Sequence, residues 1–159
     1  MKAKKGFTLV EILIVVVILG ILAAIVIPQF TDASTQAKEA NMKSTLQSVR
    51  SQIELYKIQH NDEFPGQGTG GASFAACLTG YTDVDGTTVA STASGAFGPY
   101  LQAMPTNPWN NLATVVEVET DPNETGGDDS TGWFFNTVKG SFGANDSGAT
   151  EDGVKHSSM

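Results

Sequence analysis

A long apolar run near the N-terminus limits what this chain can fold into more than any other feature. It extends from Phe7 to Ile27 (FTLVEILIVVVILGILAAIVI), and as a helix it would be roughly 31 Å long, close to the thickness of a bilayer's hydrocarbon core. A secretory signal peptide has a shorter apolar region, usually ~7–15 residues, followed by a small-residue cleavage site. Here Pro28 and Gln29 lead into more helical pattern instead. We therefore expect the segment to be retained as a membrane anchor.

Charge is distributed unevenly around this anchor. Lys2, Lys4 and Lys5 precede it, and the positive-inside rule then places the N-terminus in the cytoplasm and everything after Ile27 across the membrane. Residues 61–159 carry thirteen acidic and two basic side chains. Such an acidic region repels phosphate groups, so we expect no nucleic-acid partner.

The helical pattern continues beyond the anchor in an amphipathic form over residues 29–60. Small residues Ala33, Ala37 and Ala40 are followed by larger apolar residues spaced three and four apart, with charged residues between them. The larger set is Met42, Leu46, Val49, Ile53 and Tyr56. We expect this face to form one side of the core of a globular head.

The head itself is predicted over residues 61–159, where glycine, serine and threonine become frequent. The pattern indicates a short helix at 72–78, a loop or weak hairpin at 79–98, and strands at 114–119, 132–138 and 141–144. The predicted fold class is therefore α+β: a long N-terminal helix, transmembrane and then amphipathic, packed on a small antiparallel β-sheet head. From Asn145 onward we expect a flexible acidic tail.

Few residues of the head favour chemistry. Cys77 is the one cysteine, which excludes an intrachain disulfide. His60 is expected at the end of the long helix and His156 in the tail, neither beside a nucleophile. Nucleotide-binding, zinc-protease, dithiol and serine-hydrolase motifs are absent from the sequence. We expect no enzyme.

Three residues of the long helix stand out from their surroundings. Glu11 is an ionisable residue inside an apolar run, where a charge costs on the order of 2.5–3.5 kcal/mol at the bilayer centre and usually marks function. The alternative is that its side chain simply extends to the membrane surface. Gly20 and Pro28 lower the stability of a helix at their positions. Two interpretations are open: residues 20–28 melt locally, or the segment is an ordinary kinked membrane helix.

The run Gly6-Phe7-Thr8-Leu9-Val10-Glu11 closely resembles the class III signal of type IV pilins and type II secretion pseudopilins. The resemblance implies a pilin-like fold and cleavage between Gly6 and Phe7 by a prepilin peptidase that also N-methylates Phe7. It further implies assembly of a helical homopolymer, in which the amine of Phe7 on one subunit compensates Glu11 of a neighbour.

Within this superfamily the chain is most similar to the major pseudopilin, the general secretion pathway protein G type. The segments Gly98-Pro99-Tyr100-Leu101 and Pro105–Asn110 resemble that family's, and many type IV pilins close a disulfide that one cysteine cannot form. A surface pilus subunit for motility, adhesion or DNA uptake is the alternative. A third reading is a ligand-binding domain tethered to the membrane.

This resemblance implies an organisation for the whole chain. Residues 1–6 would be the leader, 7–28 the transmembrane and assembly helix, 29–60 the amphipathic helix, and 61–159 the periplasmic or extracellular head. The protein would cross the bacterial inner membrane once before entering a filament. Its partners would be other copies of itself, the peptidase, the inner-membrane secretion platform and minor pseudopilins.

Calcium is the one cofactor that the resemblance raises, because major pseudopilins typically bind it in an acidic C-terminal loop. Acidic residues occur there, but not with EF-hand spacing. The candidates are Asp121, Glu124, Asp128 and Asp129, with Asp146 and Glu151 more remote. We interpret the region as a solvated acidic loop and predict no metal ligands, with calcium as the alternative.

Overall fold

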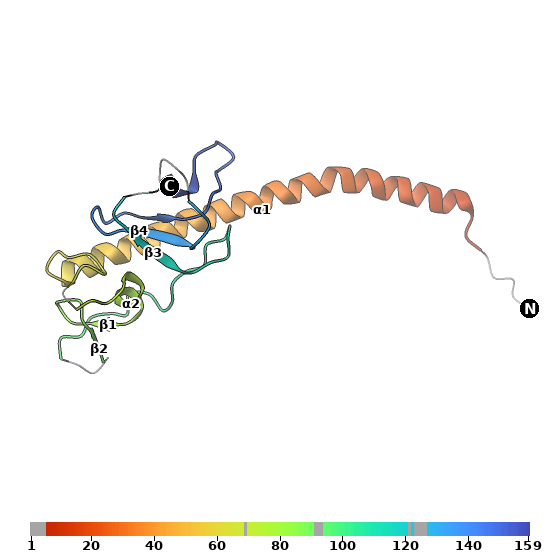
Figure 1. The fold of residues 1–159 in the computed structure, drawn as a ribbon. Helices are drawn as coiled ribbons and strands as arrows, with labels where there is room; N and C mark the ends of the chain where they lie inside the picture. Colours follow the sequence, from red (N-terminus) through yellow and green to blue (C-terminus); the bar gives the residue numbers. More distant parts are fainter. Residues whose placement is uncertain (1–5, 69, 91–93, 121, 123–126) are drawn as a thin grey trace, which may run out of the picture. The chain divides into compact units, whose positions relative to one another are not determined.

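The computed structural model describes residues 6–68, 70–90, 94–120, 122 and 127–159. They fall into two units, Met1–Lys38 and Glu39–Met159, and the helix α1 (Leu9–Gln59) contributes to both (Figure 1). The long helix expected from the sequence is therefore present. In the first unit it is long and apolar enough to cross a membrane.

The second unit is built on one face of α1. The five apolar residues predicted from the three-and-four spacing are each at most 2% exposed: Met42, Leu46, Val49, Ile53 and Tyr56. Their side chains join a single cluster that includes residues from the short helix and the sheet. The predicted core face is confirmed.

The helix α2 (Phe74–Thr79) begins at Ser73, whose hydroxyl accepts a hydrogen bond from the Ala76 N–H. Strands β1 (Tyr81–Thr82) and β2 (Thr88–Val89) follow as an antiparallel pair. Gly86 lies in the turn between them at a φ of 77°, which glycine adopts at little cost. The weak hairpin predicted for this region is confirmed.

A three-stranded sheet completes the second unit, with strand order β3-β4-β5. Its strands are β3 (Val115–Val118), β4 (Trp133–Asn136) and β5 (Phe142–Ala144). The β4–β5 pair is antiparallel, but β3 and β4 are parallel, which differs from the antiparallel sheet expected. The physical reason is the long segment between β3 and β4, because a connection of this length lets the chain begin β4 at the same end of the sheet as β3. A tight hairpin would make the two strands antiparallel.

Aromatic residues from the sheet and from α2 pack against each other. The ring of Phe74 lies 4.3 Å from that of Phe135 and 5.6 Å from that of Phe142, between ring centroids. Trp133 stacks on Phe142 and donates from Nε1 to the main-chain oxygen of Pro105 at 2.7 Å. Glu117 of β3 accepts a hydrogen bond from the Phe74 N–H, which links α2 to the sheet.

The flexible tail predicted after Asn145 is wrong. Asn145 and Asp146 are buried, residues Ala149 and Lys155 form a β-bridge, and a 3-10 helix, η1, spans His156–Ser158. The side chain of Asn145 bonds to Asp128 and Thr131, and that of Asp146 bonds to Asn107. The local sequence is polar and glycine-rich, which is typical of a flexible tail, and it does not reveal hydrogen-bond partners that are distant in the chain.

Arg50 of α1 ties the end of the chain to the sheet. Its Nε and Nη2 donate to the main-chain oxygen of Phe142 at 3.0 and 2.7 Å, and Nη2 also donates to that of Met159 at 2.8 Å. One guanidinium therefore joins α1, β5 and the last residue.

Replacing Phe74 by alanine should destabilise the head by about 3–5 kcal/mol, because it removes a fully buried ring that stacks on two others. Denaturant unfolding followed by tryptophan fluorescence measures the change. Val138→Ala, at a side chain that is 67% exposed, should change the free energy of unfolding by no more than about 0.5 kcal/mol. Equal effects from the two variants would contradict this description of the core.

Candidate functional site

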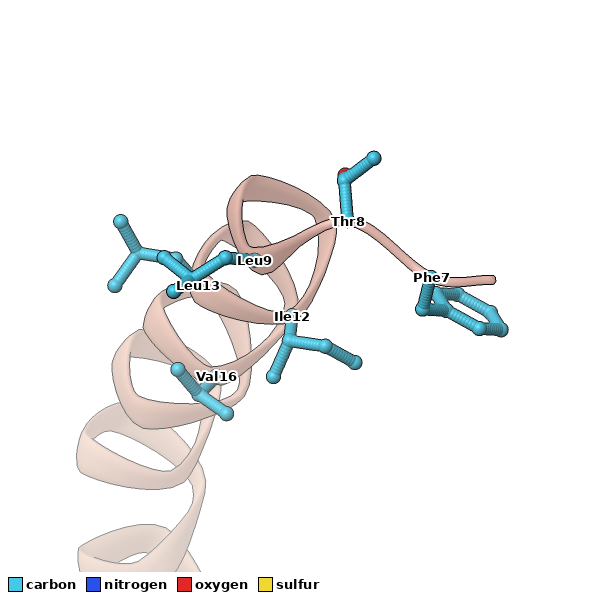
Figure 2. Close-up of a pocket in the computed structure, with 6 residues that line it drawn as sticks. All are labelled: Phe7, Thr8, Leu9, Ile12, Leu13 and Val16. Carbon is cyan, nitrogen blue, oxygen red and sulfur yellow. The ribbon is translucent and has the colours of Figure 1, made fainter. Parts of the chain in front are cut away.

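The candidate site is the start of α1. Gly6, Phe7 and Thr8 precede the helix in a non-helical conformation, and all three are exposed. Figure 2 shows Phe7 beyond the first turn, with Leu9, Ile12 and Leu13 projecting outward from the helix. The backbone around the Gly6–Phe7 bond is therefore open to other molecules.

A reciprocal capping box sets the first turn of α1. The main-chain N–H and the hydroxyl of Thr8 both donate to Glu11 Oε2 at 2.8 Å, and the Glu11 N–H donates to Thr8 Oγ1 at 3.2 Å. This is the Thr-x-x-Glu arrangement, which satisfies two otherwise unpaired donors of a helix start. The sequence reasoning singled out Glu11 but missed Thr8, although the four-residue pattern was visible.

The capping box occupies only one oxygen of the Glu11 carboxylate. Oε1 makes no hydrogen bond to any described residue. The main chain of Phe7 makes no hydrogen bond to Glu11. Within one chain, then, Phe7 and Glu11 lie at the same end of the helix but are not paired. A donor from another molecule can reach Oε1.

Glycine at position 6 has no explanation within this chain. A Cβ added there would meet nothing within 4 Å, and the backbone is not in the left-handed region. The same holds for Gly20, which lies on the exposed surface of α1. Neither residue is required by the packing or the backbone of the described structure.

The helix continues without interruption through Gly20 and Pro28. Beyond the proline, the hydroxyl of Thr31 donates to the main-chain oxygen of Ile27 at 3.2 Å, and that of Thr35 to Thr31 at 3.1 Å. The predicted melting of residues 20–28 concerns the subunit in a filament and remains a prediction.

The two histidines are both buried in the head. His60 stacks on Tyr56 and donates from Nδ1 to the Tyr56 main-chain oxygen at 2.8 Å, and its Nε2 is hydrogen-bonded to the Thr82 hydroxyl at 2.8 Å. His156 donates from Nδ1 to Asp146, whose other oxygen accepts from Asn107 Nδ2 at 2.8 Å. Both rings are structural. Sequence reasoning missed the His156 network because its members are far apart in the chain.

Where the structure describes them, the acidic residues considered for calcium do not form a metal-binding group. No group of three or more His, Cys, Asp or Glu side chains that could hold a metal occurs among the described residues. Asp121 and Glu124 lie outside those residues. Asp129 accepts from the Ser147 N–H, and Glu151 is an exposed residue of the tail.

Asp128 accepts three hydrogen bonds through one carboxylate oxygen. Its Oδ1 accepts from the hydroxyl of Ser130 at 2.6 Å, from the Ser130 N–H at 3.0 Å and from Asn145 Nδ2 at 2.7 Å. The Ser130 hydroxyl is the chief cause that holds the pKa of Asp128 below its ordinary value, followed by the Ser130 N–H. Residues 128–130 are exposed, as expected of a solvated loop, and hydrogen bonds to Asn145 and Ser147 join them to the head.

Comparison with known proteins places the start of the chain in a described family. The prokaryotic N-terminal methylation motif matches residues 1–27. The type II secretion system core protein G of Pseudomonas aeruginosa is 33% identical over 115 residues, 69% of this chain and 71% of that protein. Its counterpart in Vibrio cholerae is 29% identical over 111 residues, 70% of this chain and 69% of that protein.

A second group of relatives matches a smaller share of the chain. A major component of the type IV narrow pilus of Thermus thermophilus is 49% identical over 55 residues, which are 35% of this chain and 47% of that protein. No solved structure matches the chain.

Replacing Asp128 by asparagine should lower stability at neutral pH, and the difference from the wild type should close as the pH falls through the lowered pKa of the folded Asp128 carboxyl. The folded pKa is below the unfolded one, so the carboxylate contributes stability that is present above the unfolded pKa and lost as the pH falls through the folded pKa. Denaturant unfolding at a series of pH values measures this. Asp152→Asn makes the same change of charge at an exposed position, and a gap of constant size for Asp128→Asn would contradict the prediction.

Proposed function

This chain belongs to the superfamily of type IV pilins and type II secretion pseudopilins, and we propose that it is a structural subunit of a type II secretion pseudopilus. Proteins of this superfamily are structural subunits and not enzymes, and this holds for the chain. The observation that carries the narrower proposal is the extent of the resemblance. Three relatives named core protein G match 69%, 70% and 69% of the chain, which includes part of the head, whereas the pilus component matches 35% of the chain.

The alternative is the major subunit of a type IV pilus. It is favoured by the higher identity of the pilus component, 49% over its 55 matched residues. The two functions share the N-terminal helix and differ in the head, so the resemblance across the head supports the secretion function. Deletion should abolish protein secretion and leave surface pili in place if the chain serves secretion; loss of pili would support the alternative.

Processing is proposed at the Gly6–Phe7 bond. Three observations support it: the bond is outside the helix, its residues are exposed, and nothing in the described chain requires glycine at position 6. A residue without a side chain lets another molecule approach the backbone closely, as a peptidase must. The leader would be residues 1–6, and Phe7 would become the methylated N-terminus.

Polymerisation is proposed to pair the new amine of Phe7 with Glu11 of a neighbouring copy. The capping box supports this pairing because it holds the carboxylate through Oε2 and leaves Oε1 unbonded. Thr8 is retained after cleavage, so its contacts with Glu11 persist in the mature chain. A charge that is costly in the membrane would then be compensated between subunits, and this would set their axial offset.

The rest of the proposed organisation follows the helix. Residues 7–28 would anchor the subunit in the inner membrane and pack in the filament, with local melting at Gly20 and Pro28. Residues 29–60 would carry the head of residues 61–159 on the periplasmic side. The peptidase, the inner-membrane secretion platform and minor pseudopilins would be its partners, and the filament a helical homopolymer.

Intact mass and N-terminal sequencing of the native protein should show that the mature chain begins with methylated Phe7. Gly6→Val should block this cleavage, because a branched side chain then lies next to the bond. Gly20→Ala, at a glycine that is equally free of neighbours, should be cleaved as the wild type is. An unprocessed native chain would overturn the proposed function.

Glu11→Gln should abolish filament assembly while the chain is still inserted and cleaved. Glutamine keeps the capping box with Thr8, so the helix start is preserved and only the charge that the amine needs is lost. Sedimentation and electron microscopy of sheared filaments measure assembly, and mass spectrometry measures cleavage. Filaments with unchanged yield and subunit register would refute the role of Glu11.

A further inference from the structure

The side-chain amide of Asn145 lies among oxygen atoms of one loop. Nδ2 is 2.7 Å from Asp128 Oδ1, 2.8 Å from Thr131 Oγ1 and 3.5 Å from Ser130 Oγ. Asn145 is 4% exposed, so this nitrogen is almost completely enclosed. An –NH₂ group has two hydrogens to donate, and they account for the two short contacts.

These oxygens are of the kind that surrounds a hard cation in proteins: one carboxylate and two hydroxyls from residues close together in a loop. Here the atom among these three oxygens is the neutral amide nitrogen of Asn145, which donates hydrogen bonds. The other hydrogen bonds are oriented accordingly, since the Ser130 hydroxyl donates to Asp128 and the Thr131 hydroxyl donates to the main-chain oxygen of Trp133. Both hydroxyl oxygens can therefore accept from Asn145.

Neighbouring carboxylates are also occupied by donors. Asp146 accepts from Asn107, from the Gly148 N–H and from His156, so both of its oxygens are hydrogen-bonded. The main chain of Asn145 pairs with Asp129 and Gly132, which fixes the residue at the point where the loop meets β5. Asp146 therefore has no oxygen without a donor, and Oδ1 of Asp128 and of Asp129 is hydrogen-bonded as well.

We propose that the amide of Asn145 takes the place of a cation in the loop of residues 127–131, so that this head folds and remains folded without calcium. The proposal goes beyond the proposed function and does not depend on it, because pilus and pseudopilus subunits alike need a folded head.

The test compares thermal unfolding of the detergent-solubilised full chain in chelator and in millimolar calcium. The wild type should have the same Tm in both. Asn145→Asp replaces the donor by a second carboxylate against Asp128, so its Tm should fall in chelator and rise by about 5 °C when calcium is present well above its dissociation constant. Titration with calcium should show that the rise saturates.

Asn145→Leu is the matched control, because it removes the donor without adding an oxygen. Its Tm should fall to the same value in chelator and in calcium. Adding Asp128→Asn to Asn145→Asp should remove the calcium response, since one of the two carboxylates is then lost. Both controls are read by the same unfolding measurement.

Two results would overturn the proposal. A wild-type Tm that rises in calcium would show that the head does bind the cation, and this comparison needs no variant to fold. Failure of folded Asn145→Asp to respond to calcium would show that the amide does not occupy a cation position.

Discussion

Burial of one face of α1 is the interaction on which the head depends. The five apolar residues from Met42 to Tyr56 present a continuous surface, and the short helix and the three-stranded sheet close over it. Aromatic rings from α2, β4 and β5 complete the core from the other side. Since the sheet has only short strands, its stability comes from packing on the helix more than from its own hydrogen bonds.

Polar networks hold the parts of the head that the apolar core does not reach. Arg50 joins β5 and the last residue to α1. Asp146 accepts from His156 within the tail and from Asn107, which joins the tail to the segment that contains Asn107. Buried polar groups of this kind stabilise a fold only when their partners are present. Cys77 is the one cysteine of the chain and is buried. Hydrogen bonds, and not a disulfide, therefore hold the C-terminal segment on the head.

The other end of the molecule follows a different constraint. From Leu9 to Ile27 the helix has no protein core to face, and its apolar side chains are exposed in the described chain. The capping box of Thr8 and Glu11 satisfies the polar groups at the helix start while leaving one carboxylate oxygen available. A single helix therefore presents an apolar surface for other molecules at one end and supports a folded domain at the other.

The N-terminal helix could be predicted from the sequence because its signals are local. The apolar run, the three-and-four spacing and the Gly6–Glu11 segment all depend on residues near one another, and the core face from Met42 to Tyr56 was predicted residue by residue. The head was decided by contacts between distant residues. The parallel pairing of β3 with β4, the ordered tail and the position of Asn145 among loop oxygens arise from the tertiary structure alone. Polar side chains read as solvated in a sequence, and only the folded chain shows which of them have a buried partner.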